Sequence, residues 1–495
     1  MIKVLLNNHE VKNDVFELIR VFFPGEEIIL LENVDKLSKD GLSIISSLEN
    51  LNGKLYSNTE VYRDNNLISQ YQEDIDLIKI YRDSIEKDIR IGIKKSLFNA
   101  LKEVTDREIP WGILTGIRPV KIVHELLSKG IGDKEIIRVL TEEYKLYDSK
   151  AKLILDIGKR QIGHIYPLNK HRFSLYISIP FCPTRCLYCS FPTLPLGRFK
   201  NYIEEYVSKL IYEIKSIKKL TEGMEINTVY IGGGTPTAIP PKELEKIIQE
   251  VYNSFGEKNI KEFTVEAGRP DTITEEYLRV LNKNKINRIS INPQTMNNNT
   301  LKLIGRQHSA EDIIKTYNLA KEIGFPIINM DLIVGLPSEG VIEIQKTLGE
   351  IKKLDPENLT VHTLSIKRGS KFINTLEEYD LESQDTIGNM LEETITYSKE
   401  MGLIPYYLYR QKQILGNFEN IGYAKPNMEC IYNIAIMEEK ETIIGAGMGA
   451  VSKVFFPEEN RLERVPNFRD IKEYIERIEE QIKNKEKVVK DLLLS

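Results

Sequence analysis

From residue 173 to residue 366 the chain alternates short apolar runs with amphipathic stretches, and this alternation constrains its fold more than any other feature. The apolar runs are rich in Val, Ile and Tyr, as buried strands are, and helical spacing follows each of them. The six runs are Leu175–Ile179, Thr228–Ile231, Phe263–Ala267, Arg288–Asn292, Ile327–Val334 and Leu359–Ile366. Strand-then-helix units in series predict a parallel sheet with right-handed crossovers. We therefore expect an α/β fold, a partial (β/α)6 barrel, with ligands at the carboxyl ends of its strands.

The chain on either side of this region predicts two further parts. Residues 1–165 indicate an N-terminal α/β accessory domain, which ends at a linker, Tyr166–Lys170. The elements expected in that domain are a strand at Ile2–Leu6 and helices at Asp14–Phe23, Asp74–Glu103, Val120–Ser128 and Tyr144–Ile165. The barrel is expected over residues 171–380, and residues 381–495 are expected to form a mixed α+β region.

Composition and charge exclude several classes of protein. The 495 residues are 41% hydrophobic and 28% charged, which is typical of a globular protein and excludes global disorder. No apolar run reaches the ~20 residues that span a bilayer, and the apolar stretch at the N-terminus is too short for a secretory signal. We therefore expect a cytoplasmic protein. The formal net charge is -5, with basic residues spread along the chain, so we expect no nucleic-acid partner.

Three of the four cysteines lie within eight positions, which makes them the strongest functional signal in the sequence. Cys182, Cys186 and Cys189 form a C-x3-C-x2-C pattern directly after the first predicted barrel strand. Three thiolates on one loop can hold three corners of a [4Fe–4S] cluster and leave one iron open to a chelating cofactor. Two alternatives stay open. A zinc site would need a fourth ligand, which His171 is badly placed to supply, and the three residues could be buried structural cysteines.

The cysteine pattern resembles the radical S-adenosylmethionine (SAM) signature, and further motifs resemble the oxygen-independent coproporphyrinogen III oxidases. These motifs are Tyr176–Cys182, Gly232–Thr237, Arg288–Thr295, Leu303–His308 and Asp331–Pro337. Together with the preceding block Pro110–Pro119, they look most like the coproporphyrinogen dehydrogenase (HemZ) branch. The resemblance implies a [4Fe–4S] cluster that reductively cleaves SAM to a 5′-deoxyadenosyl radical, which then abstracts a substrate hydrogen atom.

The resemblance also implies a reaction and partners. The reaction would be the oxidative decarboxylation of two propionates of coproporphyrinogen III to vinyl groups, which gives protoporphyrinogen IX without oxygen. It would use one SAM for each propionate, and the family often binds two SAM at once. The electron donor would be of the flavodoxin or ferredoxin type. No catalytic residue is expected beyond the cluster and SAM.

The family motifs assign cofactor contacts to individual residues. Gly233, Gly234 and Thr235 would contact the methionine part of SAM, and Glu266 would bind its ribose. The other expected contacts are Gln294, Arg306 and Asp331, on nucleoside or carboxylate groups, and Tyr176, beside the cluster. Simpler roles stay open: a tight turn for the glycines, a solvated loop acid for Glu266, a structural ion pair for Arg306 and core packing for Tyr176.

Two positions and one missing motif depart from the family patterns. Phe191 stands where the oxidases often carry a fourth cysteine, and Ser178 replaces a common histidine. The related haem chaperones also have an aromatic residue at the position of Phe191, but their motif after the Ala-Lys-Pro turn is missing here. Cys430 could be a small buried residue, a substrate-side thiol or an accessory ligand. Two alternative functions therefore stay open: a radical SAM enzyme acting on another tetrapyrrole, with haem methylation and ring opening, and a chaperone that binds SAM and haem.

Overall fold

The computed structural model of the chain divides into two units, Met1–Lys159 and Arg160–Ser495. The structure describes residues 1–33, 41–75, 84–367, 369–374, 379, 381–411 and 417–494. The predicted boundaries near residues 165 and 380 stay predictions. Within the described residues, no helix is both long enough and apolar enough to cross a membrane.

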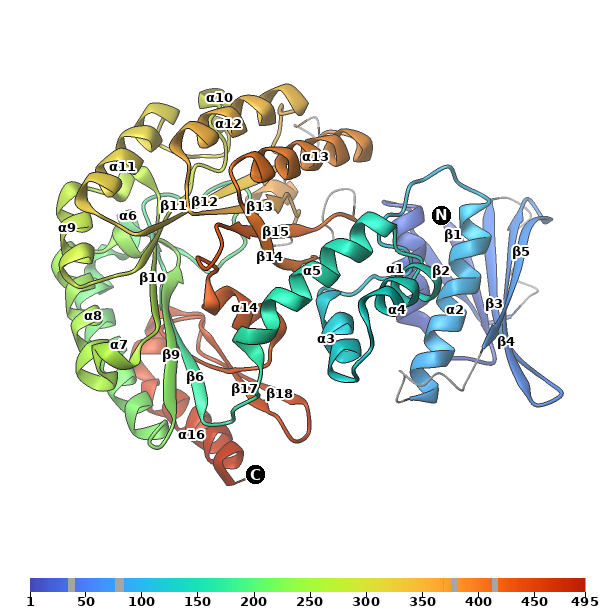
Figure 1. Ribbon diagram of the computed structural model, residues 1–495, viewed down its shortest axis with the longest axis horizontal. Helices are drawn as coiled ribbons and strands as arrows, with labels where there is room; N and C mark the ends of the chain where they lie inside the picture. The colour runs from blue at the N-terminus through green and yellow to red at the C-terminus, as the bar shows by residue number, and fades with distance from the viewer. Residues whose placement is uncertain are drawn as a thin grey trace. The chain divides into compact units, whose positions relative to one another are not determined.

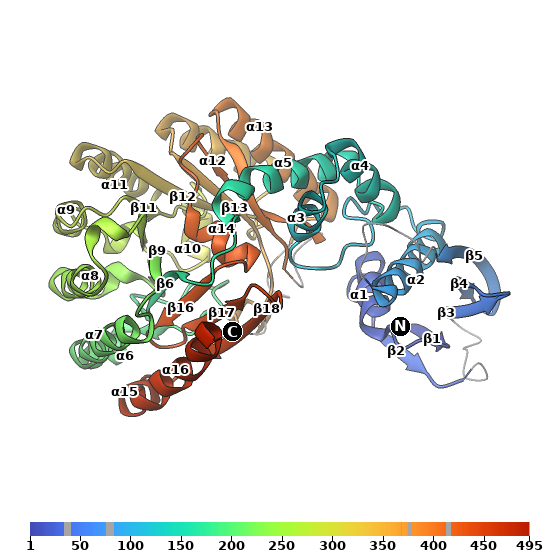
Figure 2. The same cartoon turned by 60° about the horizontal axis from the view of Figure 1, so that its bottom comes forward.

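The first unit contains a mixed five-stranded sheet in the order β2-β1-β3-β4-β5 (Figure 2). The strands are β1 (Ile2–Asn7), β2 (Ile28–Leu31), β3 (Leu42–Leu51), β4 (Lys54–Arg63) and β5 (Asn66–Ile75). The helices are α1 (Lys12–Phe22), α2 (Ile85–Lys102), α3 (Val120–Ser128), α4 (Asp133–Arg138) and α5 (Asp148–Ile165), the last of which continues into the second unit. The core lies between the sheet and the first two helices, where Val4, Leu18, Ile44 and Leu97 are fully buried. The expected strand at Ile2–Leu6 and helices at Asp14–Phe23 and Val120–Ser128 are confirmed.

The helix predicted over Asp74–Glu103 is wrong in its first part. Helix α2 begins only at Ile85, and Asp74 belongs to strand β5, while residues 76–83 lie outside the described part of the chain. Strand β5 is an edge strand, and its exposed charged side chains resemble the polar face of a helix. The turn Asn52-Gly53 joins β3 to β4, and both residues have positive φ. An Asn-Gly pair between two strands is the strongest short-range sequence signal for a hairpin.

The second unit is built on an eleven-stranded sheet in the order β14-β15-β13-β12-β11-β10-β9-β6-β16-β17-β18 (Figure 1). The six predicted strands are β6 (Arg172–Ile179), β9 (Glu225–Gly233), β10 (Glu262–Gly268), β11 (Arg288–Ile291), β12 (Ile327–Val334) and β13 (Asn358–Thr363). They pair in parallel and follow one another in space in the order of the chain. The α/β barrel fold is confirmed. The barrel is partial, because β14 and β18 form the open edges of the sheet.

Helices cover the outer face of the curved sheet, each in contact with the next (Figure 1). They are α7 (Ile203–Leu220), α8 (Pro241–Phe255), α9 (Glu275–Lys283), α11 (Ala310–Ile323), α12 (Val341–Leu354) and α13 (Gln384–Glu400). Their ends carry the expected signals. For example, Ser309 and Asp312 form a capping box at the start of α11, and Gly324 ends the helix in the left-handed conformation.

Helix α14 (Ile431–Glu438) lies on the inner face of the sheet. It contacts both β9 and β14, which are far apart in the sheet order, so the sheet curves around it. The Glu262 carboxylate accepts hydrogen bonds from the backbone amides of Ile431 and Tyr432 at the start of the helix, at 3.1 and 3.2 Å. The Cys430 thiol also donates to Glu262, at 3.3 Å. Because Glu262 begins β10, Cys430 lies at the amino edge of the parallel sheet.

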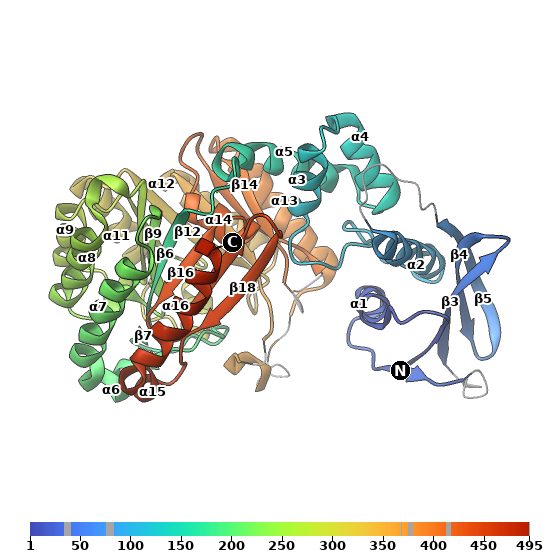
Figure 3. The same ribbon diagram turned by 90° about the horizontal axis from the view of Figure 1, so that it is seen from below.

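The C-terminal residues extend both edges of the same sheet. Strands β14 (Ile404–Tyr409) and β15 (Asn420–Ala424) follow β13, whereas β16 (Thr442–Ala446) pairs in parallel with β6. Strands β17 (Val451–Phe456) and β18 (Arg461–Pro466) complete that side. Helix α16 (Ile478–Leu494) packs against both strands and lies beside β18 in Figure 3, whereas α15 (Ile471–Glu476) contacts α7 and α16. The residues assigned to a separate C-terminal region thus share one sheet with the barrel.

A fully buried ion pair fixes helix α16 to helix α7. The ammonium group of Lys485 donates to the Glu213 carboxylate, and neither side chain is exposed. Tyr474 and Asn467 donate to the same carboxylate at 2.7 and 2.8 Å, and so does the backbone amide of Gly447 at 2.7 Å. Glu213 therefore joins the C-terminal helices to the turn after β16.

Candidate functional site

The three clustered cysteines lie on the loop that leaves the carboxyl end of β6. Cys182 ends a short strand, β7 (Phe181–Cys182), which pairs with β8 (Leu194–Pro195). Cys182 and Cys186 are buried and Cys189 is partly buried, and all three are free thiols. The backbone amide of Cys189 donates to the carbonyl oxygen of Cys186 at 3.2 Å, which folds the loop into a turn. The loop thus has the position that the barrel topology predicted.

Neighbouring loops hold the cysteine loop in place. The amide of Leu187 donates to the carbonyl of Ile304 at 3.0 Å, and the Thr184 hydroxyl donates to the carbonyl of Gly305 at 3.2 Å. From the other side, the Arg185 guanidinium donates to the carbonyl of Gly369 at 2.5 Å. Backbone carbonyls therefore fix the loop, and the three sulfur atoms stay available as ligands.

Burial raises the pKa of two of the three clustered thiols. Burial raises the pKa of Cys182 to about 11; the hydrogen bond with Thr235 opposes this rise, whereas the nearby Cys189 and Cys186 add to it. Burial also raises the pKa of Cys189. Such thiols are protonated at neutral pH until a metal displaces the protons. In the described residues, no group of three His, Cys, Asp or Glu side chains is arranged to hold a single metal ion. A [4Fe–4S] cluster does not need such a group, because each of its thiolate ligands binds a different iron atom.

The glycine run Gly232–Gly234, at the carboxyl end of β9, packs directly against the cysteine loop. The amide of Gly234 donates to the carbonyl of Ile179, and the amide of Thr235 donates to that of Phe181, both at 2.8 Å. A Cβ atom on Gly234 would lie 2.7 Å from the Phe181 oxygen, so only glycine fits there. The Thr235 hydroxyl lies 3.4 Å from the Cys182 sulfur. Gly234 and Thr235 therefore lie against the start of the cysteine loop, and Gly233 directly precedes them; their role in binding SAM stays a prediction.

Glu266 and Tyr176 lie on the inner face of the barrel. The Tyr230 hydroxyl donates to Glu266 at 2.5 Å, and burial raises the pKa of the Glu266 carboxyl to about 7. Tyr230 and Tyr432 stack directly on each other, with ring centroids 4.4 Å apart, and Tyr176 lies beside both, with its centroid 6.3 Å from Tyr230 and 6.1 Å from Tyr432. Tyr432 comes from α14, and the sequence analysis missed it as part of the site. Its signal, an aromatic residue at the start of a short helix, is too common to be informative.

Gln294, which lies just beyond the end of β11, meets Asp331 in the carboxyl half of β12. The amide of Gln294 donates to the carbonyl of Asp331 at 2.9 Å, with Gln294 in the left-handed region at φ 66°. Non-glycine residues adopt this conformation at a cost, and such positions cluster at functional sites. The Asp331 carboxylate accepts from Asn329 at 2.7 Å and lies 3.9 Å from the imidazole of His362.

Arg306 lies against the cysteine loop. Its guanidinium donates to the Tyr188 hydroxyl at 2.9 Å and to the carbonyl of Gly268 at 3.4 Å. Arg306 is buried, and its Nε atom has no hydrogen-bond partner in the described structure. The guanidinium thus keeps a donor for a ligand. Every predicted site residue lies at the carboxyl side of the sheet or on its inner face, and the role of each remains a proposal.

The fold and the cysteine loop are those of a radical SAM protein. Comparison with known proteins shows that the chain belongs to this class. The model of the Radical SAM superfamily matches residues 176–351. The structure of coproporphyrinogen III oxidase (HemN) from Escherichia coli superposes with a TM-score of 0.50 over 66% of this chain and 73% of that chain, at 24% identity. That likeness concerns the fold alone. Membership of the superfamily implies a [4Fe–4S] cluster and SAM.

Curated relatives identify the family. The oxygen-independent coproporphyrinogen-III oxidase-like protein HemZ of Bacillus subtilis is 44% identical over 411 residues, which cover 82% of this chain and 82% of the relative. The heme chaperone HemW of the same organism is 29% identical over 311 residues, which cover 62% of this chain and 76% of HemW. The chain belongs to the oxygen-independent coproporphyrinogen-III oxidase-like HemZ family of radical SAM, oxidoreductase-like enzymes.

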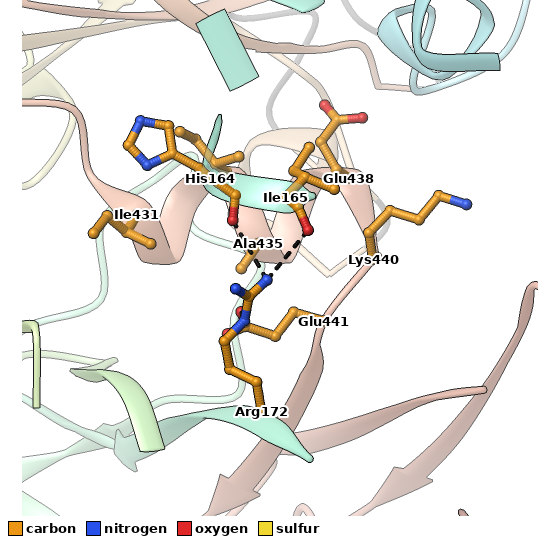
Figure 4. A pocket seen from close by; sticks show the side chains of 9 residues that line it. His164, Ile165, Arg172, Ile431, Ala435, Glu438, Lys440 and Glu441 are labelled. Carbon is orange, nitrogen blue, oxygen red and sulfur yellow. Dashed lines mark hydrogen bonds and ion pairs between the residues drawn. The ribbon is translucent and has the colours of Figure 1, made fainter. Parts of the chain in front are cut away.

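A small pocket lies at the amino end of β6, and the residues that line it have a structural role. Figure 4 shows Arg172, which begins β6, between His164, Ile165 and Glu441. Its guanidinium donates to the carbonyls of His164 and Ile165 at 3.4 and 3.2 Å and pairs with Glu441 at 2.7 Å. This network lies at the amino end of β6, whereas Cys182 follows the carboxyl end.

The raised pKa of Glu266 predicts a pH dependence of stability. Its usual pKa is 4.5, so between about pH 4.5 and 7 the folded chain keeps a proton that the unfolded chain has lost. The free energy of unfolding therefore falls as pH rises through this window, by up to about 3 kcal/mol at 1.36 kcal/mol per pKa unit. We expect urea unfolding at pH 5 and pH 8 to show this fall, and Glu266→Gln to reduce it. Glu350→Gln, at an acid outside the site, should leave the fall unchanged. An undiminished fall in Glu266→Gln would contradict the assignment.

Proposed function

We propose that this chain oxidatively decarboxylates two propionate side chains of coproporphyrinogen III to vinyl groups and so yields protoporphyrinogen IX without oxygen. The observation that carries the proposal is the loop with Cys182, Cys186 and Cys189, packed against the glycine run at the carboxyl edge of a partial barrel. Membership of the HemZ family supports the choice of a tetrapyrrole substrate.

The residues of the chain have distinct tasks in this proposal. Cys182, Cys186 and Cys189 hold the cluster, and Gly233, Gly234 and Thr235 let the methionine part of SAM approach it. When bound, the cluster and SAM supply the electron and the radical that removes a hydrogen atom from the propionate. Each propionate loses one carbon dioxide and two hydrogen atoms, and the electron that remains passes to an external acceptor. A flavodoxin or ferredoxin type of protein would supply the electron that initiates the reaction.

The remaining predicted residues position SAM on the inner face of the barrel. The Glu266 carboxyl group lies beside Gly232 and accepts a hydrogen bond from Tyr230, and it would bind the ribose hydroxyls. Gln294, Arg306 and Asp331 would bind nucleoside or carboxylate groups, and Tyr176 would lie beside the cluster and SAM. Use of two SAM molecules, one for each propionate, is part of the proposal.

A second candidate is a chaperone that binds haem and SAM. The similarity to HemW favours it, and so does Phe191, whose side chain is 62% exposed beside the cysteine loop instead of a fourth cysteine. A third candidate, a radical SAM enzyme that acts on another tetrapyrrole, would use the same cysteine loop and SAM site.

One anaerobic assay separates these candidates. The reconstituted protein is mixed with SAM, a strong reductant and coproporphyrinogen III, and the products are read by mass spectrometry. The proposal predicts deoxyadenosine and a product lighter by two carbon dioxide units and four hydrogen atoms. Deoxyadenosine with unchanged coproporphyrinogen would overturn the substrate and favour another tetrapyrrole. An intact cluster without either product would favour the chaperone if, in a separate titration, haem added to the protein showed a shift of its absorption band.

A further inference from the structure

A buried arginine from a neighbouring strand reaches the cysteine loop. Arg269 follows β10, and its Nη1 atom lies 3.9 Å from the sulfur of Cys186, at the long end of a hydrogen bond to sulfur. The same Nη1 atom donates to the carbonyl oxygen of Thr184 at 3.0 Å and to the Thr184 hydroxyl oxygen at 3.1 Å. Arg269 is only 4% exposed, so its charge acts through protein rather than through water.

Asp271 and His308 hold this arginine in one orientation. The Nε and Nη2 atoms of Arg269 donate to the two carboxylate oxygens of Asp271 at 3.1 and 2.9 Å, which is the fork geometry that fixes a guanidinium. The Nδ1 atom of His308 lies 3.3 Å from the Asp271 carboxylate. Burial alone would raise the pKa of Asp271, but hydrogen bonds with His308 and Arg269 hold it well below its usual range. The ion pair therefore stays charged, with Nη1 directed at the loop.

Two other arginines beside the loop bind it differently. Arg185 donates to the carbonyls of Cys189 and Gly369, and Arg306 donates to Tyr188 and Gly268. Their contacts fix the backbone and the Tyr188 hydroxyl. Arg269 is instead directed at a sulfur atom that would carry negative charge as a cluster ligand.

We propose that Arg269 raises the reduction potential of the cluster by donating a hydrogen bond and presenting a positive charge to the Cys186 sulfur. The inference rests on the proposed cluster and not on the identity of the substrate. Reduction adds one negative charge to the cluster, so a nearby fixed cation stabilises the reduced form more than the oxidised form. Hydrogen bonds to the sulfurs and local charge are among the factors that set such potentials.

The test compares two substitutions that should shift the potential in opposite directions. Arg269→Gln removes the cation, so we expect about a tenfold lower ratio of reduced to oxidised cluster at a fixed potential, which is about 59 mV for one electron. Asp271→Asn removes the neighbouring negative charge but leaves Arg269 bound to Thr184, so the potential should rise. The measurement is a redox titration followed by electron paramagnetic resonance. Arg279→Gln, at an exposed arginine on α9 paired with Glu275, is the matched control and should cause no shift.

Arg269→Lys keeps a positive charge without the fork, and its potential should lie between those of Arg269→Gln and the unaltered protein. Shifts of the same sign in Arg269→Gln and Asp271→Asn, or loss of iron from both, would overturn the inference and leave Arg269 as a structural tie. Unchanged potentials would overturn it equally. If the unaltered protein forms no [4Fe–4S] cluster, the proposed function fails before the variants are compared. If it forms the cluster but leaves coproporphyrinogen unchanged, the substrate proposal fails while the inference about Arg269 stands.

Discussion

Cys186→Ala is expected to abolish the cluster, which is the largest functional effect of any single substitution in this chain. Cys186 is buried at the centre of the cysteine loop, between Thr184 and the turn to Cys189. Without it, two thiolates remain for a cluster that needs three protein ligands to leave a single open iron. After anaerobic reconstitution, iron and acid-labile sulfide should fall from about four of each per chain to nearly none. Deoxyadenosine formation should fall with them.

Cys430→Ala is the matched control for this substitution. Cys430 is also buried, but its thiol donates to Glu262 at the amino edge of the sheet, on the opposite side from the cysteine loop. The variant should therefore keep its full iron content. A Cys186→Ala protein that still held about four irons would contradict the cluster assignment, and so would a Cys430→Ala protein that lost them.

Lys485→Met is expected to cause the largest loss of stability. The substitution leaves the Glu213 carboxylate fully buried with its cation removed, although Tyr474, Asn467 and Gly447 still donate to it. Breaking a buried ion pair by removing one partner costs about 3–5 kcal/mol. Chemical denaturation followed by circular dichroism measures this loss of unfolding free energy.

A lysine on the same helix supplies the control. Lys490 pairs with Glu486 at 2.6 Å, and its side chain is 66% exposed. Exposed helix pairs contribute about 0.3–0.5 kcal/mol, so Lys490→Met should change stability little. The double substitution Glu213→Leu with Lys485→Met should recover part of the loss, because no charge then stays buried. If Lys485→Met and Lys490→Met were equally stable, the buried pair could not have the anchoring role described here.

The parts of the fold that follow local patterns could be predicted from the sequence. Strand β12 has the expected bounds, Ile327–Val334, because apolar periodicity reports burial within a single element. The cysteine loop and the glycine run could also be found. Their chemistry needs several residues at short spacing, and the barrel topology places the ends of neighbouring strands together.

The parts that depend on distant contacts could not be predicted. Tyr432 joins Tyr176 and Tyr230 only because α14 enters the concave face of the sheet, which no local pattern indicates. Lys485 looks like one of many lysines in a charged helix, and its partner Glu213 is 272 residues away. Arg269 follows a strand in an ordinary Gly-Arg-Pro-Asp sequence, and only the tertiary structure directs it to Cys186.

The position of β16 sets an order for folding during synthesis. Strand β6 carries the cysteine loop at its end and has β9 on one side, but its other side stays open until residues 442–446 pair with it. Nearly the whole chain must therefore leave the ribosome before the strand that supports the three cysteines has both neighbours. Pairing across such a long separation in sequence is slow to form. Until then β6 is an edge strand of the sheet, with one row of its backbone amide and carbonyl groups unpaired.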